Sequence, residues 1–230
     1  MRKALTIGTA VALVGGAAMW FATTVGAQGG GTVEVEVKYN GPAKVDKLKV
    51  NKDTEKCGTE TMIEHVVVGA NKGLANAVAS APGAKGAKAT AKAVIDQHGC
   101  KFVPHVVVMQ PGEIEVKNSD DILHNIHTYS TANPSINKAQ PKFKKVMTEK
   151  LEKPEFVKVT CDVHSWMLGW VAVVPGVAAA TDANGVAKLE NVPAGKQKIE
   201  VWHETLGKQE KEVDVKAGQT TKVSFEMKGK

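Results

Sequence analysis

The sequence predicts an all-β protein with two β-sandwiches, a larger one followed by a smaller one at the C-terminal end. In residues 33–38, valines alternate with charged side chains, and this period of two is typical of a half-buried strand. Glycine-containing turns such as Pro111-Gly112 and Asn184-Gly185 separate short β-branched runs. No segment carries a convincing long helical period, so strands should dominate the fold.

The strands of the larger sandwich are expected in the valine-rich runs before Pro175. After Pro175, shorter runs follow one another between turns, which is the pattern of a small antiparallel sandwich. That part has roughly 55 residues, which is marginal for an independent domain, so it should pack against the preceding one. The expected strand runs are 33–37, 105–109, 114–116, 157–159 and 171–174, then 186–189, 199–202, 213–215 and 223–225.

The first 27 residues have the pattern of a signal peptide. Arg2 and Lys3 precede an uncharged run, and Val25-Gly26-Ala27 offers small residues at a cleavage position. The alternative is an uncleaved membrane anchor, because the uncharged run is long enough to span a bilayer. The sequence therefore predicts a periplasmic or extracellular protein that has no membrane insertion once the leader is removed.

The charge pattern argues against nucleic-acid binding. The formal net charge is +6, and two of the positive charges belong to the leader. Lysines are spread along the whole chain rather than clustered on one segment. Nucleic acids are therefore excluded as expected partners.

One short segment carries the residues of a metal site. Cys161, His164 and Met167 lie within seven residues, directly after a predicted strand. Thiolate, imidazole and thioether ligands select copper over hard cations, and two histidines with a cysteine and a weak axial methionine describe a blue-copper site. The second histidine is missing from this segment, but His124 and His127 lie upstream. These two histidines are three residues apart, so on an extended chain their side chains point to opposite faces. Only one of them can therefore face the site.

Zinc is the rival metal, because cysteine and histidine are also its ligands. Taken singly, each residue would more often be an ordinary core side chain. Structural zinc sites use four cysteine or histidine donors rather than methionine, so the combination favours one copper ion.

Residues 103–174 resemble a cupredoxin of the amicyanin and plastocyanin type. The resemblance lies in the Pro111-Gly112 turn before a strand, in Leu123-His124-Asn125-Ile126-His127, and in the ligand loop, whose spacing is that of amicyanin. It implies a Greek-key sandwich with His124, Cys161 and His164 as strong ligands and Met167 as the axial ligand. It also implies that Asn125 ties the two ligand loops together by hydrogen bonds.

The C-terminal part resembles a carboxypeptidase regulatory-like module of the transthyretin type, through Thr181-Asp182, Asn184-Gly185 and Val192-Pro193-Ala194-Gly195. The expected organisation is a leader at 1–27, a cupredoxin domain with an N-terminal extension at 28–174, and this module at 175–230. Cys57 and Cys100 are predicted to form a disulfide, the alternative being two unrelated buried thiols.

The predicted function is the transfer of single electrons between exported redox partner proteins. A saturated mononuclear site leaves no open position for a substrate, so the protein is not expected to be an enzyme. Two alternatives stay open: a copper carrier or buffer, and a structural or adhesion protein. Since every proposed ligand precedes Pro175, the sequence also predicts that the metal site survives removal of the C-terminal module.

Overall fold

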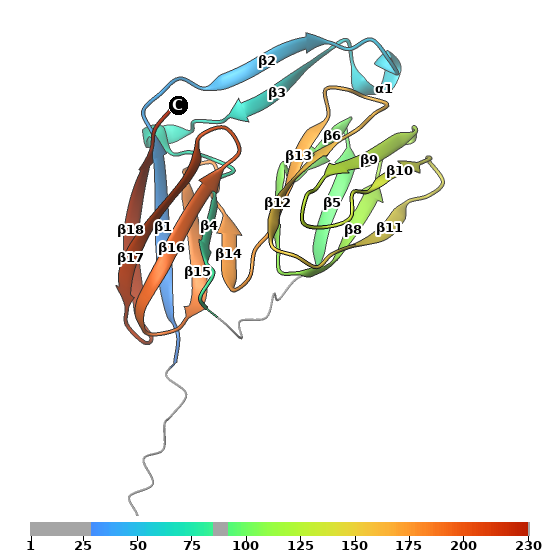
Figure 1. The fold of residues 1–230 in the computed structure, drawn as a ribbon. Coiled ribbons are helices and arrows are strands. Elements are labelled where there is room, and N and C mark those ends of the chain that lie inside the picture. Colours follow the sequence, from blue (N-terminus) through green and yellow to red (C-terminus); the bar gives the residue numbers. More distant parts are fainter. Residues whose placement is uncertain (1–28, 85–91, 230) are drawn as a thin grey trace, which may run out of the picture.

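A computed structural model of the chain describes residues 29–84 and 92–229. Within these residues strands make up almost all regular structure, and they form two sandwiches and a long hairpin (Figure 1). The all-β prediction is confirmed. The predicted leader, 1–27, lies outside the described residues. In the two described ranges, no helix has the length and apolar character needed to cross a membrane.

The sandwich that contains the predicted ligands is named here the inserted sandwich. Its two sheets have the strand orders β10-β9-β12-β13-β7 and β11-β8-β5-β6. The strands are β5 (Ala93–His98), β6 (Lys101–Val103), β7 (Val106–Met109), β8 (Gly112–Asn118), β9 (His124–Tyr129), β10 (Asn137–Gln140), β11 (Val146–Leu151), β12 (Glu155–Thr160) and β13 (Leu168–Val173).

Side-chain periodicity explains these strands. In β8, Ile114 and Val116 enter the core and alternate with partly exposed residues. In β13 the apolar run is continuous because both of its faces are covered: Val171 faces the core, whereas Ala172 packs toward the second sandwich.

The second sandwich is named the outer sandwich. Its sheets have the orders β15-β1-β18 and β14-β4-β16-β17. Val33, Val35 and Val37 are fully buried at its centre, and β1 runs parallel to the last strand of the chain. The strands are β1 (Gly31–Tyr39), β4 (Val78–Ala81), β14 (Val177–Ala180), β15 (Val186–Val192), β16 (Gly195–His203), β17 (Gly207–Val215) and β18 (Thr220–Met227).

The strand pairing differs from the predicted division at Pro175. The prediction grouped the N-terminal extension with the cupredoxin in residues 28–174, but β1 and β4 belong to the outer sandwich. The inserted sandwich therefore interrupts the outer one between β4 and β14. Alternating valines reveal a half-buried strand, yet they do not reveal which distant strand pairs with it, and this is why the sequence misplaced the extension.

A hairpin, named here the arm, reaches from the outer sandwich across to the inserted sandwich (Figure 1). It consists of β2 (Lys44–Lys49), helix α1 (Thr54–Cys57) and β3 (Glu60–Val66). Its tip is joined covalently to the turn between β5 and β6 by the disulfide Cys57–Cys100, whose Cα atoms are 5.4 Å apart. The predicted disulfide is confirmed, and it fixes the arm against the inserted sandwich.

An aromatic and ionic contact joins the two sandwiches away from the arm. Trp202 stacks on Phe156 with ring centroids 4.1 Å apart and meets Trp170 edge-on at 5.2 Å. His105 Nε2 lies 2.6 Å from Glu204 Oε1, and Glu204 Oε2 accepts the indole N–H of Trp170. Trp170 and His105 therefore serve the interface rather than the predicted metal site.

Candidate metal centre

The ligand loop turns inward directly after β12. Cys161 follows the last residue of that strand, and a turn closed by the Met167 N–H donating to the His164 carbonyl, 2.9 Å away, leads into β13. Both Cys161 and His164 are buried, the second completely. A short loop between two paired strands thus carries both donors into the end of the core.

The upstream histidine of the site is His124, the first residue of β9. Its ring is fully buried beside Cys161 and His164. His127 lies on the other face of the strand, where its Nδ1 is 2.9 Å from Asp162 and its ring stacks on Tyr129. The alternation of a strand has therefore placed only one of the two histidines at the site.

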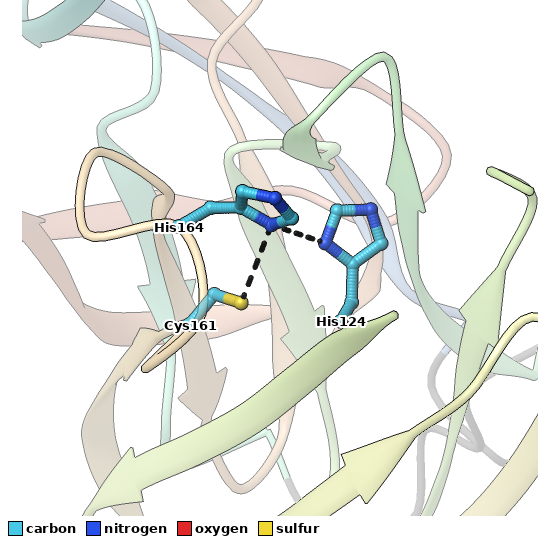
Figure 2. Close-up of side chains that lie close together, drawn as sticks. All are labelled: His124, Cys161 and His164. Atoms are coloured by element: carbon cyan, nitrogen blue, oxygen red, sulfur yellow. Dashed lines mark hydrogen bonds between the residues drawn. The ribbon is translucent and has the colours of Figure 1, made fainter. Parts of the chain in front are cut away.

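Three donor atoms converge at this point (Figure 2). The Nδ1 atoms of His124 and His164 are 3.0 Å apart, and Cys161 Sγ is 3.9 Å from His164 Nδ1. One donor atom from each residue lies within 4.8 Å of the others. A single metal ion bound by one sulfur and two nitrogens fits this arrangement.

The far side of each imidazole is held by a carboxylate. His124 Nε2 lies 2.9 Å from Asp120 Oδ2, and His164 Nε2 lies 2.8 Å from Asp53 Oδ2. A carboxylate accepts the Nε2–H, so each Nδ1 presents a lone pair toward the centre. Two lone pairs facing at this distance repel unless a cation lies with them, so the donor set suits a bound metal.

The protonation preferences of the site depend on burial. Burial lowers the pKa of His124 and so favours the neutral ring that a metal needs. Burial raises the pKa of the Cys161 thiol, although backbone N–H groups of His164 and Asn125 at its sulfur oppose this. A coordinated metal ion deprotonates such a thiol outright, so the buried sulfur is suited to a metal rather than to free-thiolate chemistry.

Asn125 connects the two ligand segments. Its Oδ1 accepts the Asp162 backbone N–H at 3.0 Å, and its Nδ2 donates to Asn137 at 2.7 Å. The side chain thereby fixes β9 to the loop beside Cys161, which is the role that the resemblance implied.

Met167 is buried at the end of the same loop. It belongs to the core that contains Cys161 and lines a cavity of about 150 Å³ between β3 and the loop. Its axial role stays a prediction.

Two residues of the site were missed by sequence reasoning about ligands. Asp120 lies only four residues before His124, so a carboxylate at that spacing was a usable signal. Asp53 is 111 residues away from its partner His164, and nothing in its local pattern marks it.

Comparison with known proteins adds partial likenesses only. No family model matches the chain. No curated protein matches it either. Among solved structures, a purple cupredoxin from Nitrosopumilus maritimus is 20% identical with a TM-score of 0.31, over 36% of this chain and 99% of that one.

Two further structures show the same extent of similarity. Amicyanin from Paracoccus versutus is 16% identical over 37% of this chain and 83% of its own, with a TM-score of 0.33. A copper-containing nitrite reductase from Thermus scotoductus SA-01 is 22% identical over 40% of this chain, with a TM-score of 0.32, and only 25% of that enzyme is covered. The metal assignment therefore rests on the side chains described above.

The choice between the two upstream histidines gives a direct prediction. We expect His124→Ala to lose the trigonal copper signal in electron spin resonance after Cu(II) titration, because one of three strong donors is gone. His127→Ala is the matched control on the same strand and should keep that signal. The reverse pattern would move the ligand to His127 and contradict the geometry.

Proposed function

We propose that this chain is an exported mononuclear type 1 copper protein that carries single electrons between redox partner proteins. The observation that carries the proposal is the buried convergence of His124 Nδ1, His164 Nδ1 and Cys161 Sγ. Two imidazoles and one thiolate are the in-plane ligands of such a site, and Met167 would supply the weak axial one.

The donor set favours copper over zinc. Closed zinc sites are tetrahedral and take four cysteine or histidine donors. Three such donors converge here among the described residues, with a buried methionine at the end of the same loop. Soft sulfur ligands combined with imidazole suit a metal that alternates between Cu(I) and Cu(II).

The residues around the donors favour electron transfer because they hold the donors still. Carboxylates fix both rings, Asn125 fixes the ligand loop, and backbone N–H groups lie at the sulfur. A bound copper ion would supply the one-electron couple. The fixed donors would keep the same geometry in both oxidation states, so little rearrangement accompanies each transfer.

We propose no enzymatic activity, since a ligand set closed by protein donors offers no position to a substrate. A periplasmic or extracellular location is proposed from the leader pattern. The outer sandwich is proposed to be the transthyretin-type module that the C-terminal sequence resembles, with β1 and β4 added to it.

The visible spectrum after addition of Cu(II) tests this proposal. We expect intense colour from charge transfer between the Cys161 thiolate and Cu(II), and we expect a mild reductant to bleach it. A colourless protein that retains zinc instead would overturn the proposed function. Rapid transfer of Cu(I) to a chelator would favour the carrier alternative.

A further inference from the structure

His164 is unusually well covered for a residue on a loop at the end of a sandwich. Its side chain has no exposed surface. Trp166 lies on one side, with ring centroids 5.1 Å apart, and His124 lies on another at 4.8 Å. The arm supplies the remaining partner, since Asp53 lies 2.8 Å from His164 Nε2. The outer edge of this ring therefore meets a carboxylate rather than solvent.

Asp53 has a backbone and side-chain arrangement that serves His164 rather than its own helix. It is the N-cap residue of α1, yet its side chain makes no capping hydrogen bond. A free N-cap aspartate would normally accept a helix N–H. Its backbone has a φ of 51°, in the left-handed region, and its carbonyl accepts the N–H groups of Lys56 and Cys57. The carboxylate is left free to reach the imidazole.

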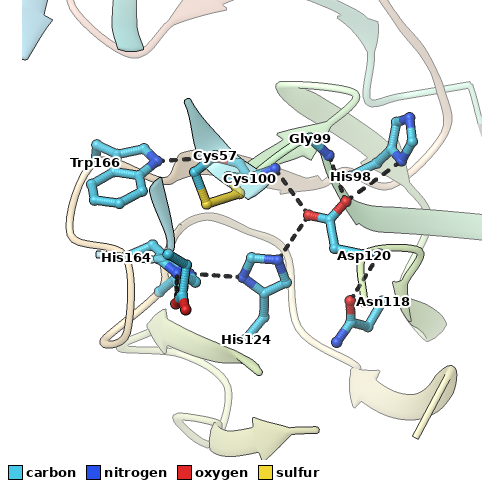
Figure 3. Close-up of a disulfide and its surroundings, with 11 residues drawn as sticks. Cys57, His98, Gly99, Cys100, Asn118, Asp120, His124, His164 and Trp166 are labelled. Atoms are coloured by element: carbon cyan, nitrogen blue, oxygen red, sulfur yellow. Dashed lines mark hydrogen bonds and ion pairs between the residues drawn. A yellow bond between two sulfur atoms is a disulfide. The ribbon is translucent and has the colours of Figure 1, made fainter. Parts of the chain in front are cut away.

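The disulfide joins the segment that carries Asp53 to the turn whose backbone contacts Asp120, and Figure 3 shows it beside Asp120 and His124. Cys57, four residues after Asp53, is bonded to Cys100. The Cys100 N–H donates to Asp120, 2.9 Å away, and Asp120 holds His124. Although burial opposes it, the Cys100 N–H and His124 lower the pKa of Asp120, which stays ionised at neutral pH. One covalent bond thus fixes the positions of two negatively charged groups behind two ligand rings.

We infer that Asp53, presented by the arm, is a positioning residue for the copper ligand His164 and lowers the reduction potential of the site. This inference rests on the proposed copper site. Asp53 acts in two ways: it fixes the Nε2–H tautomer, which leaves Nδ1 to the metal, and it places a negative charge behind the ring.

The sign of the effect follows from the charge change on reduction. Cu(II) carries one more positive charge than Cu(I), so a nearby carboxylate stabilises the oxidised form more than the reduced form. Removing that carboxylate should therefore favour Cu(I) and raise the potential. Asp53 is 36% exposed, so solvent weakens this effect without abolishing it.

The first test is the pair Asp53→Asn and Asp53→Gly, made in the full chain. Asparagine and glycine both adopt the left-handed backbone conformation readily, so neither substitution should strain the start of α1. Asparagine keeps the shape and an acceptor oxygen but removes the charge, whereas glycine removes both. We expect a higher potential in both variants and a heterogeneous spin-resonance signal only in the glycine variant.

Loss of an outer partner of a metal-bound histidine typically costs about 10- to 100-fold in metal affinity. A tenfold loss that falls on Cu(II) alone would raise the potential by about 59 mV, the one-electron equivalent of that factor. The measurements are spectroelectrochemical titration and competition titration with Cu(II) and Cu(I).

Asp46→Asn is the matched control on the same arm. Asp46 also pairs with a histidine, His65, 3.0 Å away, but it is 55% exposed and touches no ligand. Its substitution should leave the potential and the spectrum unchanged. An intact mass that shows the Cys57–Cys100 bond in each variant confirms that the arm is still attached.

The role of Asp53 and the proposed copper site are tested separately, and the role of Asp53 can also be measured on the metal-free chain. Nitrogen NMR of His164 should show the Nε2–H tautomer in the wild type and a change in the Asp53→Gly variant. If the wild type is coloured and both Asp53 variants have the same reduction potential as the wild type, the proposed role of Asp53 is wrong and the copper site stands. A colourless wild type would instead overturn the proposed function, whatever the NMR shows.

Discussion

Cys161→Ser is expected to abolish the visible colour of the Cu(II)-loaded protein. The colour comes from electron transfer between the thiolate sulfur and Cu(II), and an alkoxide or hydroxyl oxygen cannot replace that covalent bond. The buried Sγ also provides one of three converging donors, so Cu(II) should bind more weakly. Its spin-resonance spectrum should be that of a copper ion without a thiolate ligand. The check is absorption and spin resonance during Cu(II) titration.

Ser165→Ala is the matched control for this change. Ser165 lies in the same loop but is exposed, and it is not one of the converging donors. We expect full colour in this variant. Strong colour that persists in Cys161→Ser would show that the chromophore lies elsewhere and would contradict the assigned site.

A chain that ends at Pro175 is expected to lose its soluble folded state. The sequence alone predicted that the metal site survives this truncation with some loss of thermal stability, because the ligands precede Pro175. The structure gives the opposite expectation, since removing β14 to β18 leaves β1 and β4 without partners. Val33, Val35 and Val37 would become exposed, and each burial is worth about 1.5 to 3 kcal/mol.

Size-exclusion chromatography and circular dichroism check this result. We expect the truncated chain to aggregate, and we expect less protein that binds copper. Lys222→Gln in the full chain is the control. It breaks only the ion pair with Glu34 between β18 and β1, which contributes little to stability because solvent screens it. A monomeric truncated chain with native melting behaviour would contradict the assignment of β1 to the outer sandwich.

The sequence predicted which side chains converge better than it predicted the groups that surround them. Cys161 and His164 lie three residues apart on one loop, so their meeting is a local property that spacing reveals. Strand alternation allowed only one of His124 and His127 to face the site, and the family resemblance favoured His124. The structure places His124 with the other two donors.

Long-range pairing was beyond the sequence. The parallel pairing of β1 with β18 joins residues from opposite ends of the described chain, and identical alternation would suit many partners. The contact between Asp53 and His164 depends on the arm, whose path follows from that pairing and from the disulfide. A carboxylate in a helix-capping position carries no sign of such a role.

The insertion also sets an order of events during synthesis. Ala81 in β4 and Val177 in β14 are direct partners, so the chain leaves the outer sandwich and returns at adjacent positions. A chain that emerges from its N-terminal end presents every strand from β5 to β13 before β14 exists. All strands of the inserted sandwich and both cysteines of its disulfide are thus present while β1 still waits for β18. Strand pairing in the inserted sandwich can therefore begin before the outer sandwich is closed.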